Sequence, residues 1–269
     1  MIIAVNYANQ KFKRAQKFNS RTAIRFGADR VIEYTPDDID ADFYKKNKEV
    51  LNAKKGNGYY LWKPYFLNKA YQELQEGDYL IYTDSGAIYV DQIQKLIDCM
   101  EREHQDIMIF SLEKELLERK YTKKDAFILM DCDSEEYWDT PQSIGGYVLC
   151  KKSPLVEKFL REDLEYAQDP RIISEIPNTQ GKEDAPDFIM HRHDQSVWSL
   201  MSKKYQLKRF RDPSQFGMIH EYEEEVAERS TYPQVIDSTR MNAANMLEVK
   251  WRRSKPGDFC HKVKVKFFG

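Results

Sequence analysis

Residues 77–86 read Gly77-Asp78-Tyr79-Leu80-Ile81-Tyr82-Thr83-Asp84-Ser85-Gly86. The apolar run follows a turn glycine and ends at a carboxylate, which predicts a buried strand over 79–83. In open α/β sheets, ligands bind at the carboxyl ends of strands, so Asp84 stands where a ligand is expected. The small residues Ser85 and Gly86 leave space beside it. The other interpretation is a strand-end Asp that caps the turn after it.

Predicted strands and helices alternate along the chain. The apolar runs predict strands over 2–5, 31–34, 79–83, 106–110 and 147–150, and helical spacing predicts helices over 11–26, 64–74, 90–100, 154–166 and 194–205. This alternation predicts an α/β fold. We expect one domain over 1–240, with the polar stretch 168–190 as a long loop.

The bulk composition excludes several classes of protein. A net charge of -2 over 269 residues does not favour a nucleic-acid partner. The four cysteines are far apart, which suggests neither a zinc site nor a disulfide framework. No basic leader and no 18-residue apolar run occurs, so we expect a cytoplasmic protein.

The segment 241–269 is basic and aromatic. Seven lysines or arginines lie between Lys250 and Phe268. Such a segment can lie peripherally on an anionic membrane, with its aromatic rings at the level of the headgroups. An edge strand over 263–267, protected by lysines, explains the pattern equally well.

A dense polar cluster stands at 191–196, where a loop is predicted to become a helix. Asp194 there can act as a general base on an acceptor hydroxyl, and Gln195 can hold a donor hydroxyl. A plain helix cap also explains Asp194. His191 and His193 lack a third ligand nearby in sequence, so we expect hydrogen bonds to acceptor or sugar rather than zinc.

Three further positions are weaker candidates. Gly145 and Gly146 allow the backbone to approach a ligand closely, although a simple bulge also explains them. Lys124 and Asp125 offer a phosphate contact and a sugar contact, or they belong to a solvated loop. His220 is a candidate metal or phosphate contact, or a structural histidine.

Five motifs, taken together and in order, resemble bacterial GT-A-fold glycosyltransferases that build capsular, O-antigen and related surface polysaccharides. They are Gly58-Tyr-Tyr-Leu-Trp-Lys-Pro-Tyr65, the 77–86 stretch, Tyr121-Thr-Lys-Lys-Asp125, Gln142-Ser-Ile-Gly-Gly146 and His191-Arg-His-Asp-Gln-Ser196. The resemblance spans about residues 1–205. It implies a Rossmann-like, mixed and mainly parallel sheet, a UDP-sugar donor and a glycan or lipid-linked acceptor. The transferred sugar would be a hexose, with galactose (pyranose or furanose) favoured.

The resemblance also assigns roles to residues. Asp84 would hold Mn²⁺ or Mg²⁺ and the donor diphosphate, and Lys63 would balance phosphate charge. His220, beyond the span of the resemblance, stays a second candidate for the metal. Gly86 stands where a second acidic residue is usual. Asp194 would act as base or as stabiliser of the anomeric carbon. The donor and nucleotide side would comprise Asn6, Tyr7, Tyr60, Trp62, Lys63, Thr83, Asp84, Ser85, Lys124, Asp125, Gly145 and Gly146.

Two alternatives come from other classes of activity. The same sheet edge suits a sugar nucleotidyltransferase, but the glycine-rich basic signature expected near the first strand is missing. A non-catalytic carbohydrate-binding protein on the same fold is the second, and Gly86 in place of an acid is its support.

Overall fold

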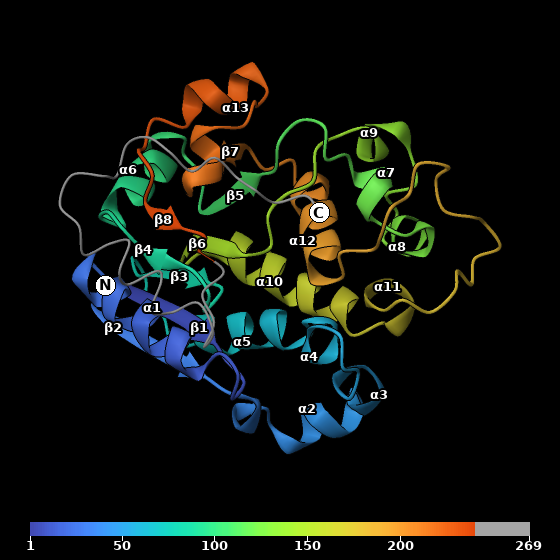
Figure 1. Cartoon of the computed structure of the whole chain (residues 1–269), viewed down its shortest axis with the longest axis horizontal. Helices are drawn as coiled ribbons and strands as arrows, with labels where there is room; N and C mark the ends of the chain where they lie inside the picture. Colours follow the sequence, from blue (N-terminus) through green and yellow to red (C-terminus); the bar gives the residue numbers. More distant parts are fainter. Residues whose placement is uncertain (240–269) are drawn as a thin grey trace.

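The computed structural model describes residues 1–239. A central six-stranded sheet has the order β2-β1-β3-β6-β5-β7 (Figure 1). β1 is parallel to β2 and β3, β5 is parallel to β7, and β6 is antiparallel to both of its neighbours. The predicted α/β class with a mixed, mainly parallel sheet is confirmed. The strands are β1 Ile2–Tyr7, β2 Arg30–Tyr34, β3 Tyr79–Thr83, β5 Ile107–Ser111, β6 Tyr147–Lys151 and β7 Arg209–Arg211.

Helices cover both faces of this sheet, which is why its four inner strands, β1, β3, β5 and β6, are mostly apolar and buried. Alternate residues along β1 divide between two core clusters: Ile3 and Val5 face one, and Ala4 faces the other. The first cluster includes α5 (Trp62–Tyr71), α10 (Pro154–Ala167) and α12 (Asp194–Lys204). The second includes residues of α1 (Lys13–Arg25) and α6 (Gln94–Arg102).

Local chemistry explains where these helices begin. α10 begins at Pro154, a residue suited to a first turn because its missing N–H has no intrahelical partner there. The Ser153 hydroxyl before it accepts from Val156 N–H (3.3 Å). The helix predicted over 90–100 begins later, at Gln94.

Shorter elements complete the described part. A small antiparallel sheet pairs β4 (Ile88–Tyr89) with β8 (Ile236–Asp237). The predicted loop over 168–190 contains one turn of helix, α11 (Pro170–Ile173). The remaining helices are α2 Ala41–Lys46, α3 Lys48–Leu51, α4 Gly56–Tyr59, α7 Glu118–Tyr121, α8 Lys124–Leu129, α9 Glu135–Trp138, α13 Glu224–Arg229 and the 3₁₀ turns η1 Pro36–Asp38 and η2 Gln215–Met218.

Two expectations from composition can be checked within residues 1–239. Cys99, Cys132 and Cys150 are free and buried there. None of the described helices combines the length and the apolar character needed to span a membrane. The basic tail, with its predicted edge strand over 263–267, lies outside the described residues.

Candidate active site

Asp84 lies directly after β3, at the start of the turn that leaves the sheet. Its backbone N–H donates to the Gly146 carbonyl oxygen (3.0 Å), which joins the ends of β3 and β6. The side chain is 54% exposed, and Oδ1 accepts from the Tyr82 hydroxyl (2.6 Å). Within residues 1–239, no backbone N–H donates to this carboxylate. The turn-capping interpretation is therefore not supported, and the carboxylate can accept a ligand.

The two glycines before β6 allow a close approach between this carboxylate and α12. A Cβ at Gly146 would lie 3.3 Å from Asp84 Oδ2, and a Cβ at Gly145 would lie 3.0 Å from Gln195 Cβ. Gly145 N–H also donates to Gln195 Oε1 (3.2 Å). The segment between Asp84 and α12 thus has room for glycine and little else.

Lys63, in the first turn of α5, connects the two acidic positions. Its Nζ lies 2.7 Å from Asp194 Oδ2 and 3.6 Å from Asp84 Oδ1. It also donates to the Gly145 carbonyl oxygen (2.9 Å). The side chain is only 8% exposed. Burial opposes its charge, but the Asp194 and Asp84 carboxylates outweigh burial, so the pKa of Lys63 is raised. Lys63 was assigned to phosphate, and here its ammonium already balances two carboxylates.

Asp194 is the first residue of α12, where the helix dipole favours a negative charge. Burial raises the pKa of its carboxyl to about 6, and the Lys63 ammonium opposes that rise. His193 immediately before it has φ 54° and ψ −121°. Positive φ at a bulky residue is uncommon and concentrates at functional sites. Asp194 is therefore ionised at neutral pH, yet more basic than an ordinary Asp.

These positions belong to one cleft of about 1160 Å³. Asp84 and the pair Asp194–Gln195 line it together, so the two acidic positions face the same space. The other predicted site residues that line it are Tyr7, Tyr60, Trp62, Lys63, Ser85, Gly145, Gly146, His191, His193 and His220.

The aromatic wall of the cleft rests on an unusual backbone turn. All five residues of 56–60 have positive φ, from 50° to 98°, and three of them are not glycine. The Trp62 indole N–H donates to the Gly56 carbonyl oxygen (3.0 Å), and the Trp62 ring stacks on Tyr7 (centroids 3.8 Å apart). The Gly56-Asn57-Gly58 run was the sequence signal for this turn, and the sequence interpretation did not use it.

Four predicted donor residues lie away from the cleft, which corrects their assignment. Asn6 and Thr83 are fully buried and bind Asn19, whose amide joins β1 to β3: Asn6 Nδ2 donates to Asn19 Oδ1 (2.8 Å), and Asn19 Nδ2 donates to Thr83 Oγ1 (2.7 Å). An inward position at a strand end, rather than at the turn after it, explains their burial. None of these side chains lines the cleft.

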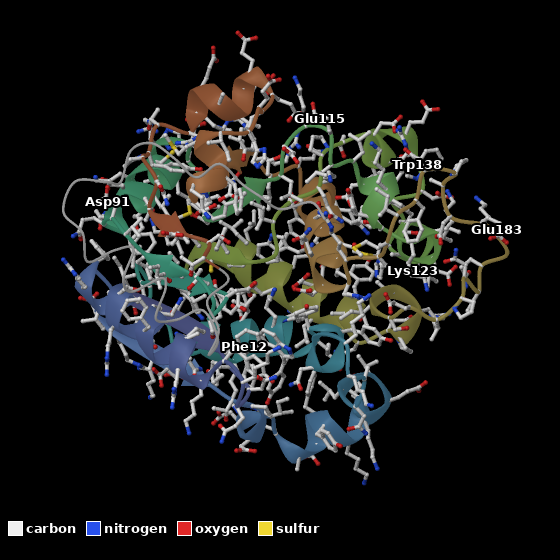
Figure 2. All side chains as sticks on the ribbon, viewed as in Figure 1. Phe12, Asp91, Glu115, Lys123, Trp138 and Glu183 are labelled. Atoms are coloured by element: carbon white, nitrogen blue, oxygen red, sulfur yellow. The ribbon has the colours of Figure 1, made fainter. Side chains whose placement is uncertain are left out.

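Lys124 and Asp125 are the other two predicted donor residues that lie away from the cleft. The buried Asp125 carboxylate accepts from the Thr179 backbone N–H (2.6 Å) and hydroxyl (2.8 Å), so it anchors the long loop. The Lys124 ammonium pairs with Asp133 and lies 4.2 Å from the Trp138 ring centroid. Figure 2 labels Trp138 and Lys123, the residue before Lys124 in the sequence, on one side of the molecule. Phe12, which lines the cleft, lies well away from both.

The two histidines of the 191–196 cluster are buried and tied to α11. His191 Nε2 lies 2.8 Å from the Ile172 carbonyl oxygen, and His193 Nδ1 lies 2.8 Å from the Ile173 carbonyl oxygen. Burial lowers the pKa of both rings, so both are neutral at neutral pH. In this arrangement they fix the loop that leads into Asp194.

His220 lines the cleft and pairs with Glu113 (Nδ1 to Oε2, 2.5 Å). In the part of the chain that the structure describes, no group of three or more His, Cys, Asp or Glu residues is arranged to hold a metal ion. Of the described acidic residues that line the cleft, Asp84 alone has an exposed side chain (54%, against 30% for Glu113 and 8% for Asp194). That donor set suits a cation that takes its remaining oxygen ligands from a bound diphosphate and water, as Mg²⁺ commonly does.

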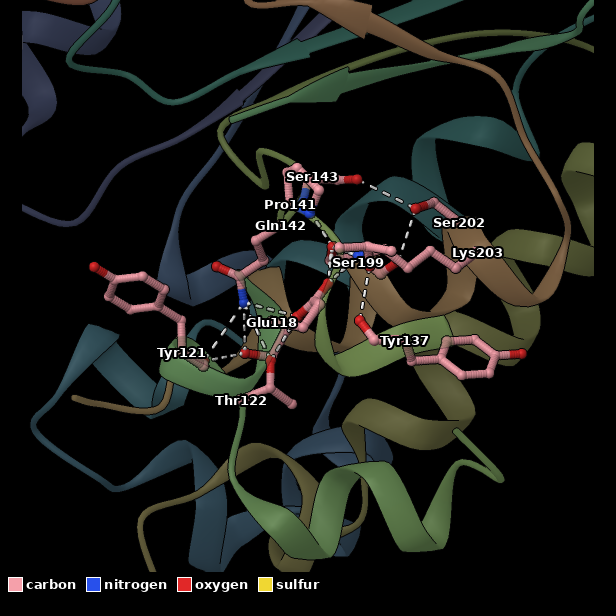
Figure 3. A network of polar contacts seen from close by, with 12 residues as sticks. Glu118, Tyr121, Thr122, Tyr137, Pro141, Gln142, Ser143, Ser199, Ser202 and Lys203 are labelled. Atoms are coloured by element: carbon pink, nitrogen blue, oxygen red, sulfur yellow. Dashed lines mark hydrogen bonds and ion pairs between the residues drawn. The ribbon is translucent and has the colours of Figure 1, made fainter. Parts of the chain in front are cut away.

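A buried polar network holds α12 in place (Figure 3). Glu118 of α7 is fully buried, and its Oε1 accepts from the Ser199 hydroxyl and from the Lys203 ammonium of α12. Its Oε2 accepts from the Thr122 hydroxyl (2.7 Å). A buried carboxylate is tolerated only with such partners, so the network fixes α12 against α7.

Gln142 extends this network to the cleft. Its Nε2 donates to Glu118 Oε2 (3.3 Å; Figure 3). Its Oε1 accepts from Gln195 Nε2 (2.8 Å) and from Arg192 Nη1 (3.2 Å). The orientation of the Gln195 amide is therefore set from the buried side. The role of Glu118 had no sequence signal, because its partners are 81 and 85 residues away.

Comparisons with known proteins do not place the chain in a family. No family model and no curated protein matches the chain. Among solved structures, the apo form of mouse xyloside xylosyltransferase 1 aligns over 88% of this chain and 97% of that chain, with 10% identity and a TM-score of 0.49. At that identity and score, the similarity carries no argument about activity.

Proposed function

We propose that this protein is a GT-A-type glycosyltransferase that moves a hexose from a UDP-sugar to a glycan or lipid-linked acceptor. One observation carries the proposal: Lys63 joins Asp84 and Asp194 at distances of 3.6 and 2.7 Å, and both carboxylates face the same cleft. Glycosyl transfer from a nucleotide sugar needs a site for the diphosphate and a carboxylate near the reacting carbon, and this cleft offers both.

In this proposal Asp84 defines the diphosphate end. Its exposed carboxylate would hold the Mn²⁺ or Mg²⁺ that the family resemblance implies, which supplies positive charge to the departing diphosphate. Tyr82 and Lys63 orient the carboxylate from behind, through its Oδ1 atom. The stacked rings of Tyr7 and Trp62 support the nucleotide end.

Asp194 and Gln195 define the sugar end. The Asp194 carboxylate accepts the proton of the acceptor hydroxyl in an inverting reaction, or stabilises charge at the anomeric carbon in a retaining one. Both roles require the ionised form, which a pKa of about 6 provides at neutral pH. Gln195, oriented by Gln142 and Gly145 N–H, hydrogen-bonds the donor sugar.

The finer assignments rest on the motifs rather than on the cleft. The resemblance favours galactose as the hexose and surface polysaccharide as the product. The basic segment 241–269 supports peripheral contact with an anionic membrane at its cytoplasmic face.

The substitution Asp194→Asn tests the proposal. Transfer should be abolished while UDP binding stays nearly intact, because the amide cannot act as base or carry charge. The measurement is release of UDP from UDP-galactose and UDP-glucose with Mn²⁺, beside UDP affinity by calorimetry. Asp91→Asn, which removes a partly exposed carboxylate that pairs with Lys95 outside the cleft, is the matched control and should change neither quantity.

Two outcomes would contradict the proposal. Equal loss of UDP binding and UDP release in the Asp194→Asn variant would assign Asp194 a structural role as a helix cap. UDP binding by the natural chain without release from any nucleotide sugar would favour the carbohydrate-binding alternative, which the single exposed acid of the cleft supports.

A further inference from the structure

Asp163 is an acid on the buried face of a helix. The buried residues of α10 are Val156, Phe159, Leu160, Asp163 and Ala167, which follow helical spacing and face the core. An aliphatic residue is expected at the fourth of these positions. Burying a carboxyl group there is costly unless it is neutral or paired, so its presence requires an explanation.

Two buried polar groups in this part of the core lack hydrogen-bond partners among the described residues: the Asp163 carboxyl and the Trp198 indole. Among residues 1–239, the Asp163 carboxyl forms no hydrogen bond or ion pair, although its residue is only 4% exposed. The buried indole Nε1 of Trp198 also has no hydrogen-bond partner there. Both side chains line one small cavity of about 10 Å³, together with Lys63 and Asp194. Four of the eight residues that line this cavity carry polar side chains, and its volume is about that needed for one water molecule.

The charges around this cavity leave no cation for Asp163. Lys63 is the charged residue that α5 presents, and its ammonium is bound by Asp194 and the Gly145 carbonyl oxygen. α12 presents Asp194. The other charged residues of the packed helices have their own partners: Lys69 has Asp40, Arg171 has Asp169, Lys203 has Glu118, and Lys204 has the Met130 carbonyl oxygen.

One ammonium thus serves two buried carboxyl groups, and Asp194 holds it. Burial, followed by repulsion from the Asp194 carboxylate, raises the pKa of Asp163 well above its usual value, and Lys63 only partly opposes this. Burial and the repulsion from Asp194 therefore both favour the neutral form of the Asp163 carboxyl group. A protonated carboxyl group donates a hydrogen bond, whereas a carboxylate only accepts.

We propose that Asp163 is a positioning residue: as a neutral carboxylic acid it donates a hydrogen bond toward the Asp194 carboxylate, through one buried water shared with the Trp198 indole. The proposal deepens the function proposed above and depends on it for its catalytic meaning. Asp194 is then held from two sides, by Lys63 at the cleft and by Asp163 behind it. The hydrogen bond favours the ionised form of Asp194, which is the form that acts in transfer.

The test compares two substitutions in the full-length protein. Asp163→Asn keeps the size and a donor group, and Asp163→Val removes the donor. Carboxyl ¹³C NMR titration follows Asp163 and Asp194 directly, without any need for turnover. In the natural chain the Asp163 carboxyl should stay protonated across neutral pH, and Asp194 should titrate with a pKa of about 6.

The variants should differ in the titration midpoint of Asp194. Asp163→Asn should leave the titration midpoint of Asp194 nearly unchanged. Asp163→Val should raise it by about one pH unit, because a hydrogen bond to the charged form is lost. Trp198→Phe removes the indole N–H while keeping an aromatic ring, and it should raise the Asp194 midpoint by less than Asp163→Val does. The acid limb of UDP release should move with the Asp194 midpoint, at unchanged KM for the UDP-sugar.

Ionisation of Asp163 below pH 5 in the natural chain would overturn the proposal. In that case Asp163→Asn would lower the Asp194 midpoint, since it would remove a nearby negative charge. These results do not depend on transferase activity. A protein that shows the expected titrations but releases no UDP would refute the proposed function and leave the Asp163–Asp194 arrangement standing.

Discussion

At the scale of single residues, Lys63 determines the electrostatics of the cleft. A buried lysine is stable only when paired, and here the pairing brings together residues 63 and 194, which are far apart in the sequence. The lysine carries no free charge for a phosphate, so additional positive charge for the diphosphate has to come from a cation or from another basic residue that lines the cleft, such as Lys54.

Removal of this lysine should destabilise the protein. Lys63→Met leaves the Asp194 carboxylate buried without its partner, and we expect the free energy of unfolding to fall by about 3–5 kcal/mol. The measurement is urea unfolding. The double variant Lys63→Met/Asp194→Asn should recover much of the loss, since no unpaired charge remains. A loss below about 1 kcal/mol in the single variant would show that water reaches Asp194 and that the pair is not buried in solution.

At the scale of elements, the position of α12 depends on a buried network rather than on the cleft. Glu118 of α7 binds two side chains of α12 and the Gln142 side-chain amide (Figure 3). Gln142 in turn accepts a hydrogen bond from Gln195. The helix that carries the proposed catalytic residues is therefore anchored about two turns from them.

Neutralising that anchor should weaken the whole helix. Glu118→Gln leaves the buried Lys203 ammonium without its counterion, and we expect unfolding to become easier by about 3 kcal/mol. Glu221→Gln, which removes the exposed pair of Glu221 with Lys114, is the matched control and should cost less than about 1 kcal/mol. Similar small effects of both substitutions on denaturant unfolding would show that the network does not fix α12.

The sequence predicted the long helices and the buried strands, but it did not predict the short helices or the contacts between elements. The strand over 79–83 and the helices α10 and α12 were predicted, because each has a clear apolar period. The segment from α7 to α9 was not predicted, because its helices are too short to show periodicity. The left-handed turn over 56–60 was missed as well, since its conformation depends on packing against Trp62 as much as on its glycines.

At the scale of the whole molecule, the cleft is formed by segments distant in the sequence. Strand ends of β1 and β3, the first turn of α5 and the start of α12 all contribute to it. The sequence predicted an α/β fold and most of the lining residues, including Asp84 and Asp194. It could not predict the antiparallel insertion of β6 between β3 and β5, because strand pairing over such separations leaves no local signal.

The misplaced site residues have the same origin. Lys124 and Asp125 resembled ligand contacts in sequence, but their partners come from the loop and from Asp133. Local pattern identifies the type of side chain, and the distant segments that pack against it decide whether it faces a ligand or the protein.

The measurement that tests the account most directly is a crystal structure of the protein with UDP and Mn²⁺, with the metal located by its anomalous scattering. We predict one manganese beside the Asp84 carboxylate, the diphosphate bound to it, and Asp194 and Gln195 facing the space beyond the β-phosphate. Chelation with EDTA should weaken UDP binding in solution accordingly. Nucleotide bound away from Asp84, or Asp84 and Asp194 opening into separate cavities, would contradict the central claim that one cleft joins the diphosphate and sugar sites.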